Sequence, residues 1–155
     1  MTEICRVIVD ASYSNDDHHA AGWASVVEYK GQKQAMWGEL VGTHTSLEAE
    51  AMGIIVALNR VNYIAQGCSS VRVLTDCAAA IGLLNGSIKK MSDFDLALLH
   101  QYRMTLNYLG VRVFLNKIKA HSSMDRPLFK MHNWVDAQAR RIMREKRQYL
   151  IQKGL

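Results

Sequence analysis

The chain has 155 residues, of which 49% are hydrophobic, and its formal net charge is +5. This length allows one well-buried core and is too short for two ordinary domains, so we expect a single domain over residues 1–155. No low-complexity tract, linker or repeat divides the chain, no stretch approaches the ~18 uninterrupted apolar residues of a membrane span, and the positive charge favours a polyanionic partner.

The first half of the chain predicts a meander of three strands followed by a helix. The strands are expected at residues 4–10, 22–30 and 33–41. Lys30-Gly31-Gln32 supplies turn chemistry between the second and third strands, so these strands are antiparallel. Apolar residues then recur at three- and four-residue steps over residues 46–61, which predicts a helix capped by Thr45 or Ser46.

The second half alternates strands and helices. We expect strands at residues 71–75 and 111–118, and helices at residues 77–84, 93–109 and 133–152. The single proline, Pro127, is expected in a late loop. The short apolar strand 71–75 is expected to be buried and parallel to the first strand. The whole order predicts an α/β fold with a mixed five-stranded sheet, its first three strands antiparallel, flanked by helices.

Four carboxylates occupy positions that this arrangement would bring to a common point. They are Asp10, Glu50, Asp76 and Asp136. Two of them follow strands expected to lie side by side, and ligands collect at the carboxyl ends of parallel strands. Each acid alone has an ordinary explanation: a strand end for Asp10, a helix N-cap for Asp76, and a first-turn helix acid for Asp136. Together they predict a two-metal phosphodiesterase site, because hard divalent cations prefer carboxylate oxygens.

The helical acid could be either Glu48 or Glu50. Glu50 shares a helix face with Leu47 and Ile54, the side expected to face the sheet, where a carboxylate is costly unless it is paired or binds a metal. Glu48 projects about 200° away around the helix and is expected to be solvated. The sequence therefore favours Glu50.

Several short motifs resemble ribonuclease H of type 1 (RNase HI-like, of the ribonuclease H-like superfamily) over nearly the whole chain. The matching segments are Val7–Ser12, Ala21–Ala24, Leu47–Ala51, Leu74–Cys77, Lys119–His121 and Asn133–Ala139. The resemblance implies a metal-dependent endoribonuclease that cuts the RNA strand of RNA–DNA hybrids and leaves 5′-phosphate and 3′-hydroxyl ends. It implies two Mg²⁺ ions, with Mn²⁺ as a possible substitute, held by Asp10, Glu50, Asp76 and Asp136.

The histidines leave one role open. His121 matches the family's loop histidine, which is proposed to move protons near the metals or to help the product leave. The segment between His121 and Asp136 is longer than is usual in the family, and it brings His132 close to Asp136. We favour His121 over His132. His18 and His19, in the first hairpin loop, are expected to be solvated.

Substrate contacts are predicted by resemblance and by charge. Thr45 and Asn85 lie where relatives contact a DNA-strand phosphate, and the segment from Ser12 to His19 would border the groove that reads 2′-hydroxyls. The extra basic helix of many bacterial relatives is missing, which leaves Lys89 and Lys90. The terminal helix offers a further basic stripe, namely Arg140, Arg144 and Arg147.

Two other functions remain open from the sequence. One is a different nuclease on the same fold, such as a resolvase or transposase core, and the other is a non-catalytic module that binds hybrids or double-stranded RNA. The three cysteines are odd in number and lack metal-ligand spacing, which indicates reduced thiols and a cytoplasmic location. The RNA–DNA hybrid is the expected partner, no membrane is involved, and the protein is expected to be a monomer or weak dimer.

Overall fold

The computed structural model describes residues 3–118 and 126–154, and all nine predicted elements are found in these ranges. The strands are β1 (Ile4–Tyr13), β2 (Ala21–Tyr29), β3 (Gln32–Leu40), β4 (Ser70–Thr75) and β5 (Arg112–Lys117). The helices are α1 (Ser46–Ile64), α2 (Ala78–Leu84), α3 (Asp93–Leu109) and α4 (Arg126–Gln152).

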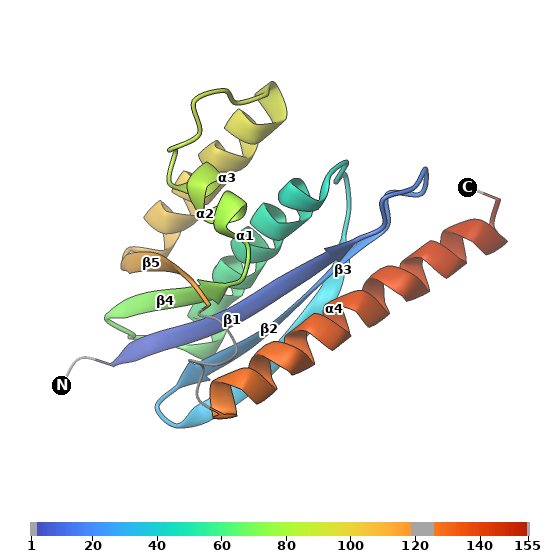
Figure 1. The fold of residues 1–155 in the computed structure, drawn as a ribbon. Helices are drawn as coiled ribbons and strands as arrows, with labels where there is room; N and C mark the ends of the chain where they lie inside the picture. Colours follow the sequence, from blue (N-terminus) through green and yellow to red (C-terminus); the bar gives the residue numbers. More distant parts are fainter. Residues whose placement is uncertain (1–2, 119–125, 155) are drawn as a thin grey trace.

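The strands form one mixed sheet in the order β3-β2-β1-β4-β5. Strands β1, β2 and β3 pair antiparallel, whereas β4 pairs parallel with both β1 and β5. Helix α4 crosses one face of the sheet, and α1 lies against the other face (Figure 1). The predicted fold class is confirmed, with helices on both faces of a five-stranded sheet.

Alternation along β1 divides the buried side chains between the two faces. Val7 and Val9 belong to the core under α1, whereas Ile8 belongs to a second cluster with Val135 and Ala139 of α4. This follows from the period of two residues along a strand. Asp10 is two residues beyond Ile8, and this period places it on the α4 side of the sheet.

A glycine in β2 lets α4 approach the sheet closely. A Cβ atom added at Gly22 would lie 2.7 Å from Cβ of Ile142 and 2.8 Å from the carbonyl oxygen of Ala139. Real Cβ atoms do not tolerate such distances, so any larger residue would push α4 away from β2. The position of α4, and of the polar side chains it carries, therefore depends on this glycine.

Two predicted boundaries near the acidic residues were wrong. Strand β1 continues to Tyr13 rather than ending at Asp10. Helix α4 begins at Arg126 rather than at residue 133, so Pro127 lies in its first turn and not in a loop. Proline is tolerated there because the first-turn N–H groups have no partner within the helix.

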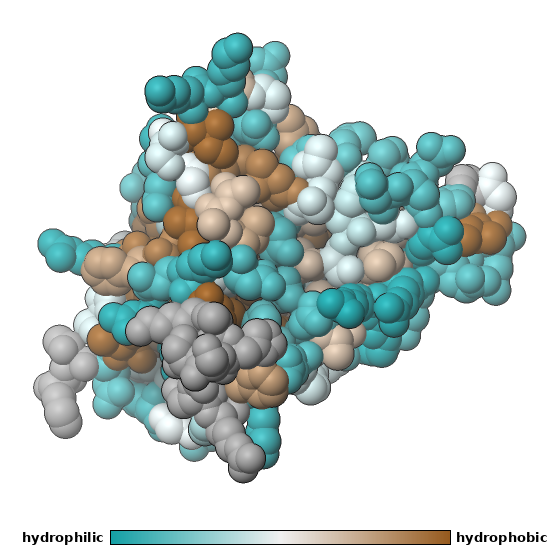
Figure 2. Space-filling model, viewed as in Figure 1, coloured by the Kyte–Doolittle hydropathy of each residue, from teal (hydrophilic) through white to brown (hydrophobic). Residues whose placement is uncertain are grey.

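Helix α4 is the longest element, with 27 residues, but it is amphipathic. Its residues, which run towards the right of the view in Figure 2, are mainly hydrophilic on the side shown. Within the described ranges, no helix combines the length and the apolar character needed to cross a membrane.

Candidate active site

Strands β1 and β4 stop pairing just before Asp10. Pairing between β1 and β4 ends at Ile8 and Leu74, whereas β1 continues to pair with β2 through Asp10 and beyond. Asp10 therefore lies inside β1 but past the last residue that has a β4 neighbour. The gap lets side chains from the α1 side and the α4 side reach the same carboxylate, which is only 3% exposed.

Glu50 of α1 approaches Asp10 through this gap, and each carboxyl group affects the pKa of the other. Burial raises the pKa of Asp10, and the nearby charge of Asp76 raises it further. Burial also raises the pKa of Glu50, with an added contribution from the charge of Asp10. The backbone N–H of Ala11 donates to Oδ1 of Asp10 at 2.9 Å. This hydrogen bond lowers the pKa of Asp10 but offsets only part of the increase.

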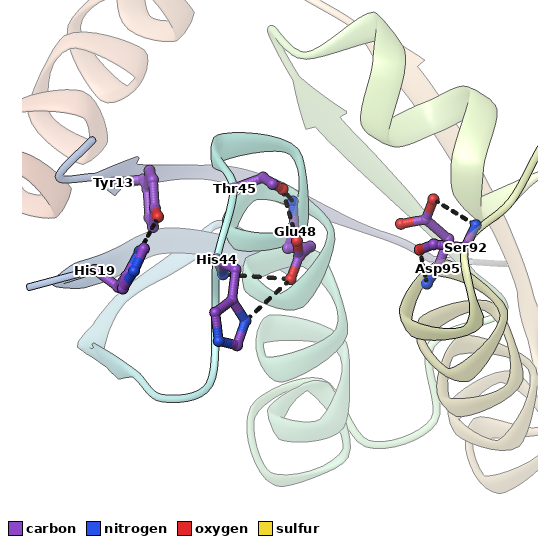
Figure 3. Close-up of polar contacts among 7 residues, drawn as sticks. All are labelled: Tyr13, His19, His44, Thr45, Glu48, Ser92 and Asp95. Atoms are coloured by element: carbon purple, nitrogen blue, oxygen red, sulfur yellow. Dashed lines mark hydrogen bonds and ion pairs between the residues drawn. The ribbon is translucent and has the colours of Figure 1, made fainter. Parts of the chain in front are cut away.

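Glu48 was expected to be solvated, and that expectation was wrong, since Glu48 is buried. Its backbone N–H donates to Oγ1 of Thr45 at 3.1 Å, and Thr45 Oγ1 donates back to Glu48 Oε2 at 2.9 Å. The backbone N–H of His44 adds a third hydrogen bond (Figure 3). Glu48 therefore stabilises the N-terminus of α1, while Glu50 faces the acidic cluster.

Asp76 follows β4 directly and lies beside His132 of α4. Its Oδ2 atom is 3.5 Å from Nε2 of His132, whose side chain is largely buried. The polar contact with His132 lowers the pKa of Asp76, and the same contact raises the pKa of His132. The alternative explanation of Asp76 as a helix N-cap does not hold: the N-cap of α2 is Cys77, and no side-chain hydrogen bond caps that helix.

Asp136 lies one helical turn after His132 and also approaches Asp10, whose pKa it raises. Its Oδ2 atom forms an ion pair with the guanidinium of Arg140 at 3.1 Å. All four predicted acids thus contact one another through Asp10 or lie within its electrostatic reach. Among the described residues, donor atoms of Asp10, Asp76 and His132 all lie within 4.8 Å of one another.

Of the two candidate loop histidines, the structure describes only one. His121 lies outside the described residues. His132 lies within α4 and faces the cluster. The sequence did not predict this position because the helix was expected to begin one residue later. Had Pro127 been read as a first-turn residue, His132 and Asp136 would have been placed four residues apart on one helix face.

The hairpin histidines are not simply solvated. His19 has a left-handed backbone conformation with φ of 52° and makes a side-chain hydrogen bond to Tyr13. Its ring lies 5.4 Å from the ring of His44, and the Nδ1 atom of His18 is buried. These side chains therefore help to fix the β1–β2 connection against the loop that precedes α1.

The residues predicted to contact substrate lie on separate elements. Ser12 is on β1 and is half-buried, and Thr45 is exposed at the N-terminus of α1, where its hydroxyl is engaged with Glu48. Asn85 caps the C-terminal end of α2. Lys89 and Lys90 are exposed in the connection from α2 to α3.

Two of the three arginines in the predicted basic stripe of α4 form ion pairs within the chain. Arg140 pairs with Asp136, and Arg147 pairs with Asp16 of the β1–β2 connection at 2.5 Å. The hydrogen bond from Arg147 lowers the pKa of Asp16 to about 2. Arg144 lies between them in sequence and is exposed.

Known proteins resemble this chain in structure. No family model matches the sequence, and no curated protein matches it at the sequence level. A ribonuclease H1 from Halobacterium salinarum superposes with a TM-score of 0.70 at 16% identity, covering 92% of this chain and 98% of that one. The N-terminal ribonuclease H domain of a Mycobacterium tuberculosis protein gives a TM-score of 0.63 at 20% identity, covering 93% and 97%.

A third structure is LC11 ribonuclease H1 from compost, crystallised in complex with an RNA/DNA hybrid. It gives a TM-score of 0.61 at 13% identity and covers 86% of this chain and 97% of that one. The strand order and the placement of the helices agree with these likenesses. The chain therefore has the ribonuclease H-like fold, in the form that ribonucleases H1 share.

Proposed function

We propose that this protein is a metal-dependent endoribonuclease that hydrolyses the RNA strand of RNA–DNA hybrids, leaving 5′-phosphate and 3′-hydroxyl ends. The observation that carries the proposal is the meeting of carboxylates from two strands and two helices at Asp10. A fold maintained for stability alone would not bury uncompensated acids beside one another, because each ionised carboxylate is costly there.

The donor set fits a site for divalent cations. Asp10, Glu50, Asp76 and Asp136 offer the oxygen ligands that Mg²⁺ prefers, and Mn²⁺ accepts the same set. When bound, two cations would lower the pKa of an attacking water and neutralise charge on the departing oxygen. The raised pKa values of Asp10 and Glu50 also support a cation site, because positive charge would relieve the repulsion between these acids.

The chain's own residues would position the substrate and manage protons. A histidine beside the metals would move a proton near the scissile phosphate, and His121 remains the proposed residue, with His132 as the alternative. Ser12, Thr45 and Asn85 would contact the hybrid near the cluster. Lys89, Lys90, Arg140 and Arg144 would contact phosphates farther away. We extend the proposal to a single domain over residues 1–155 acting in the cytoplasm.

The test uses three duplexes of one sequence, RNA–DNA, RNA–RNA and DNA–DNA, each incubated with the full chain and Mg²⁺ or Mn²⁺. We expect cleavage of the RNA strand of the hybrid, no cleavage in excess chelator, and products that carry 5′-phosphate. The Asp10→Asn variant is the matched control for a contaminating nuclease.

The other outcomes point to the other functions. Cleavage of DNA in preference to the hybrid would indicate a resolvase-like or transposase-like nuclease. Metal-independent binding of the hybrid without cleavage would indicate a binding module, and both results would contradict the proposed activity.

A further inference from the structure

His132 is a buried imidazole at the edge of the acidic cluster. It lies on the face of α4 that meets the sheet, between Met131 and Val135, and only 8% of it is exposed. Burying an imidazole costs free energy unless its nitrogens interact with polar groups. Here the polar groups are acids of the cluster, since Nε2 lies 3.5 Å from Oδ2 of Asp76.

The donor atoms around His132 have the spacing of a ligand set. One atom each of Asp10, Asp76 and His132 lies within 4.8 Å of the other two. Ligand atoms on opposite sides of a cation with bonds of about 2.1–2.2 Å are about 4.2–4.4 Å apart. Small side-chain rotations would therefore bring all three atoms to bonding distance from one ion.

Asp136 and His132 are one turn apart on α4 but have different neighbours. Asp136 is paired with the guanidinium of Arg140 at 3.1 Å, so a protein cation already balances its charge. His132 faces Asp76, and Asp10 and Asp136 also contribute to its electrostatic environment. The nitrogen of His132, rather than an oxygen of Asp136, completes the tight group with Asp10 and Asp76.

We propose that His132 is a direct nitrogen ligand of the metal held by Asp10 and Asp76, and that this ligand gives the site a preference for Mn²⁺ over Mg²⁺. The inference rests on the proposed metal dependence and adds to it the ligand and the ion. Mg²⁺ binds almost entirely through oxygen. Mn²⁺ accepts the same carboxylates but, as a first-row transition metal, binds an imidazole nitrogen more readily than Mg²⁺ does.

A competing role for His132 is that of a counter-ion which only balances Asp76. The two roles differ in where the Nε2 lone pair is directed. A ligand directs it to the metal, so the nitrogen nucleus couples to the unpaired electrons of Mn²⁺. A counter-ion carries a proton on Nε2 and gives no such coupling.

The experiment is pulsed electron paramagnetic resonance on the full chain with one equivalent of Mn²⁺. We expect nitrogen modulation typical of a bound imidazole, which changes form when histidine is labelled with ¹⁵N. The modulation should disappear in His132→Gln and persist in His100→Gln, an exposed histidine on α3. Bound Mn²⁺ itself should be lost in Asp10→Asn.

Metal titrations give a second measurement without using activity. We expect His132→Gln to weaken Mn²⁺ binding roughly tenfold, as is common for altered metal sites, and Mg²⁺ binding much less. The preference for Mn²⁺ should therefore shrink in this variant, whereas His100→Gln should keep it. Thermal unfolding of each variant shows whether it is folded, and the wild-type spectrum tests the ligand without any substitution.

The outcomes separate this inference from the proposed function. Mn²⁺ that binds in an Asp10-dependent way without nitrogen coupling would overturn the ligand role and leave the proposed nuclease intact. Absence of Asp10-dependent Mn²⁺ binding would overturn both. Nitrogen coupling in a protein that fails to cut any duplex would uphold the ligand and overturn only the nuclease.

Discussion

The acidic cluster has two halves that differ in how their charge is balanced. Where α1 reaches the site, Asp10 and Glu50 contact each other, and both have raised pKa values. On the α4 side, Asp76 is paired with His132 and Asp136 with Arg140. The comparison indicates that, without metal, the Asp10–Glu50 half holds the unbalanced negative charge, whereas Asp76 and Asp136 each have a basic partner within the chain.

The largest expected effect comes from removing the acid at the centre of the uncompensated half. Asp10→Asn should abolish metal-dependent cleavage, because an amide does not supply the anionic oxygen that a hard cation requires. The metal-free variant should melt at the same temperature as the wild type or higher, because a repulsive contact with Glu50 is lost. Cleavage assays and thermal unfolding check both parts. A folded variant with near-normal turnover would contradict a role for Asp10 in the metal site.

A second test compares two acids on the same helix. Glu50→Gln should reduce cleavage by several orders of magnitude and leave stability unchanged or increased. Glu48→Ala should instead lower the free energy of unfolding by about 1 kcal/mol, the usual cost of a lost helix cap, while cleavage changes little. The two variants are matched, since they lie two residues apart on α1. A reversed pattern would mean that Glu48 is the functional acid.

The pH dependence of stability should also separate the two halves. Asp10 and Glu50 have folded-state pKa values above their unfolded values, so the metal-free folded protein binds more protons and loses stability as pH rises above about 4.5. Asp76 has a lowered pKa, so its contribution is present above its unfolded value and is lost only at lower pH. The raised pKa of His132 adds a loss that begins above about 6.5.

Thermal unfolding without metal between about pH 4.5 and 6.5 therefore reports mainly on Asp10 and Glu50. We expect the melting temperature to fall across this window in the wild type and to fall less in Asp10→Asn. An added divalent cation should also reduce the slope. If the wild type and Asp10→Asn have identical profiles of melting temperature against pH, the repulsion between Asp10 and Glu50 does not contribute to stability in solution.

The smallest expected effect concerns the basic side chains of α4. Arg140 and Arg147 already form ion pairs within the chain, which leaves Arg144 as the arginine of the predicted stripe to test first. Arg144→Ala should raise the Michaelis constant a few-fold and reduce the slope of log affinity against log salt by about 0.9, the value for one phosphate contact. Turnover at saturation should be unchanged. An unaltered salt dependence would exclude Arg144 from the hybrid interface and favour Lys89 and Lys90.

Much of the fold was predictable because its signals are local. Strand alternation, helix periodicity and turn residues such as Gly31 and Gly110 specify where elements begin and end. Predictions were wrong where a residue is compatible with two different local structures. Pro127 was read as a loop residue although it is compatible with the first turn of α4, and the helix start was therefore placed seven residues late.

The sequence by itself determined the order of the elements, the mixed character of the sheet and the identity of the four acids that meet at Asp10. Only the tertiary structure decided which neighbours balance each charge. Ion pairs such as Arg147 with Asp16, and the contact of Asp76 with His132, join residues far apart in the chain. Periodicity assigns a side chain to a face but does not specify its partner on the opposing element, which depends on how closely α4 packs against Gly22 and the rest of the sheet.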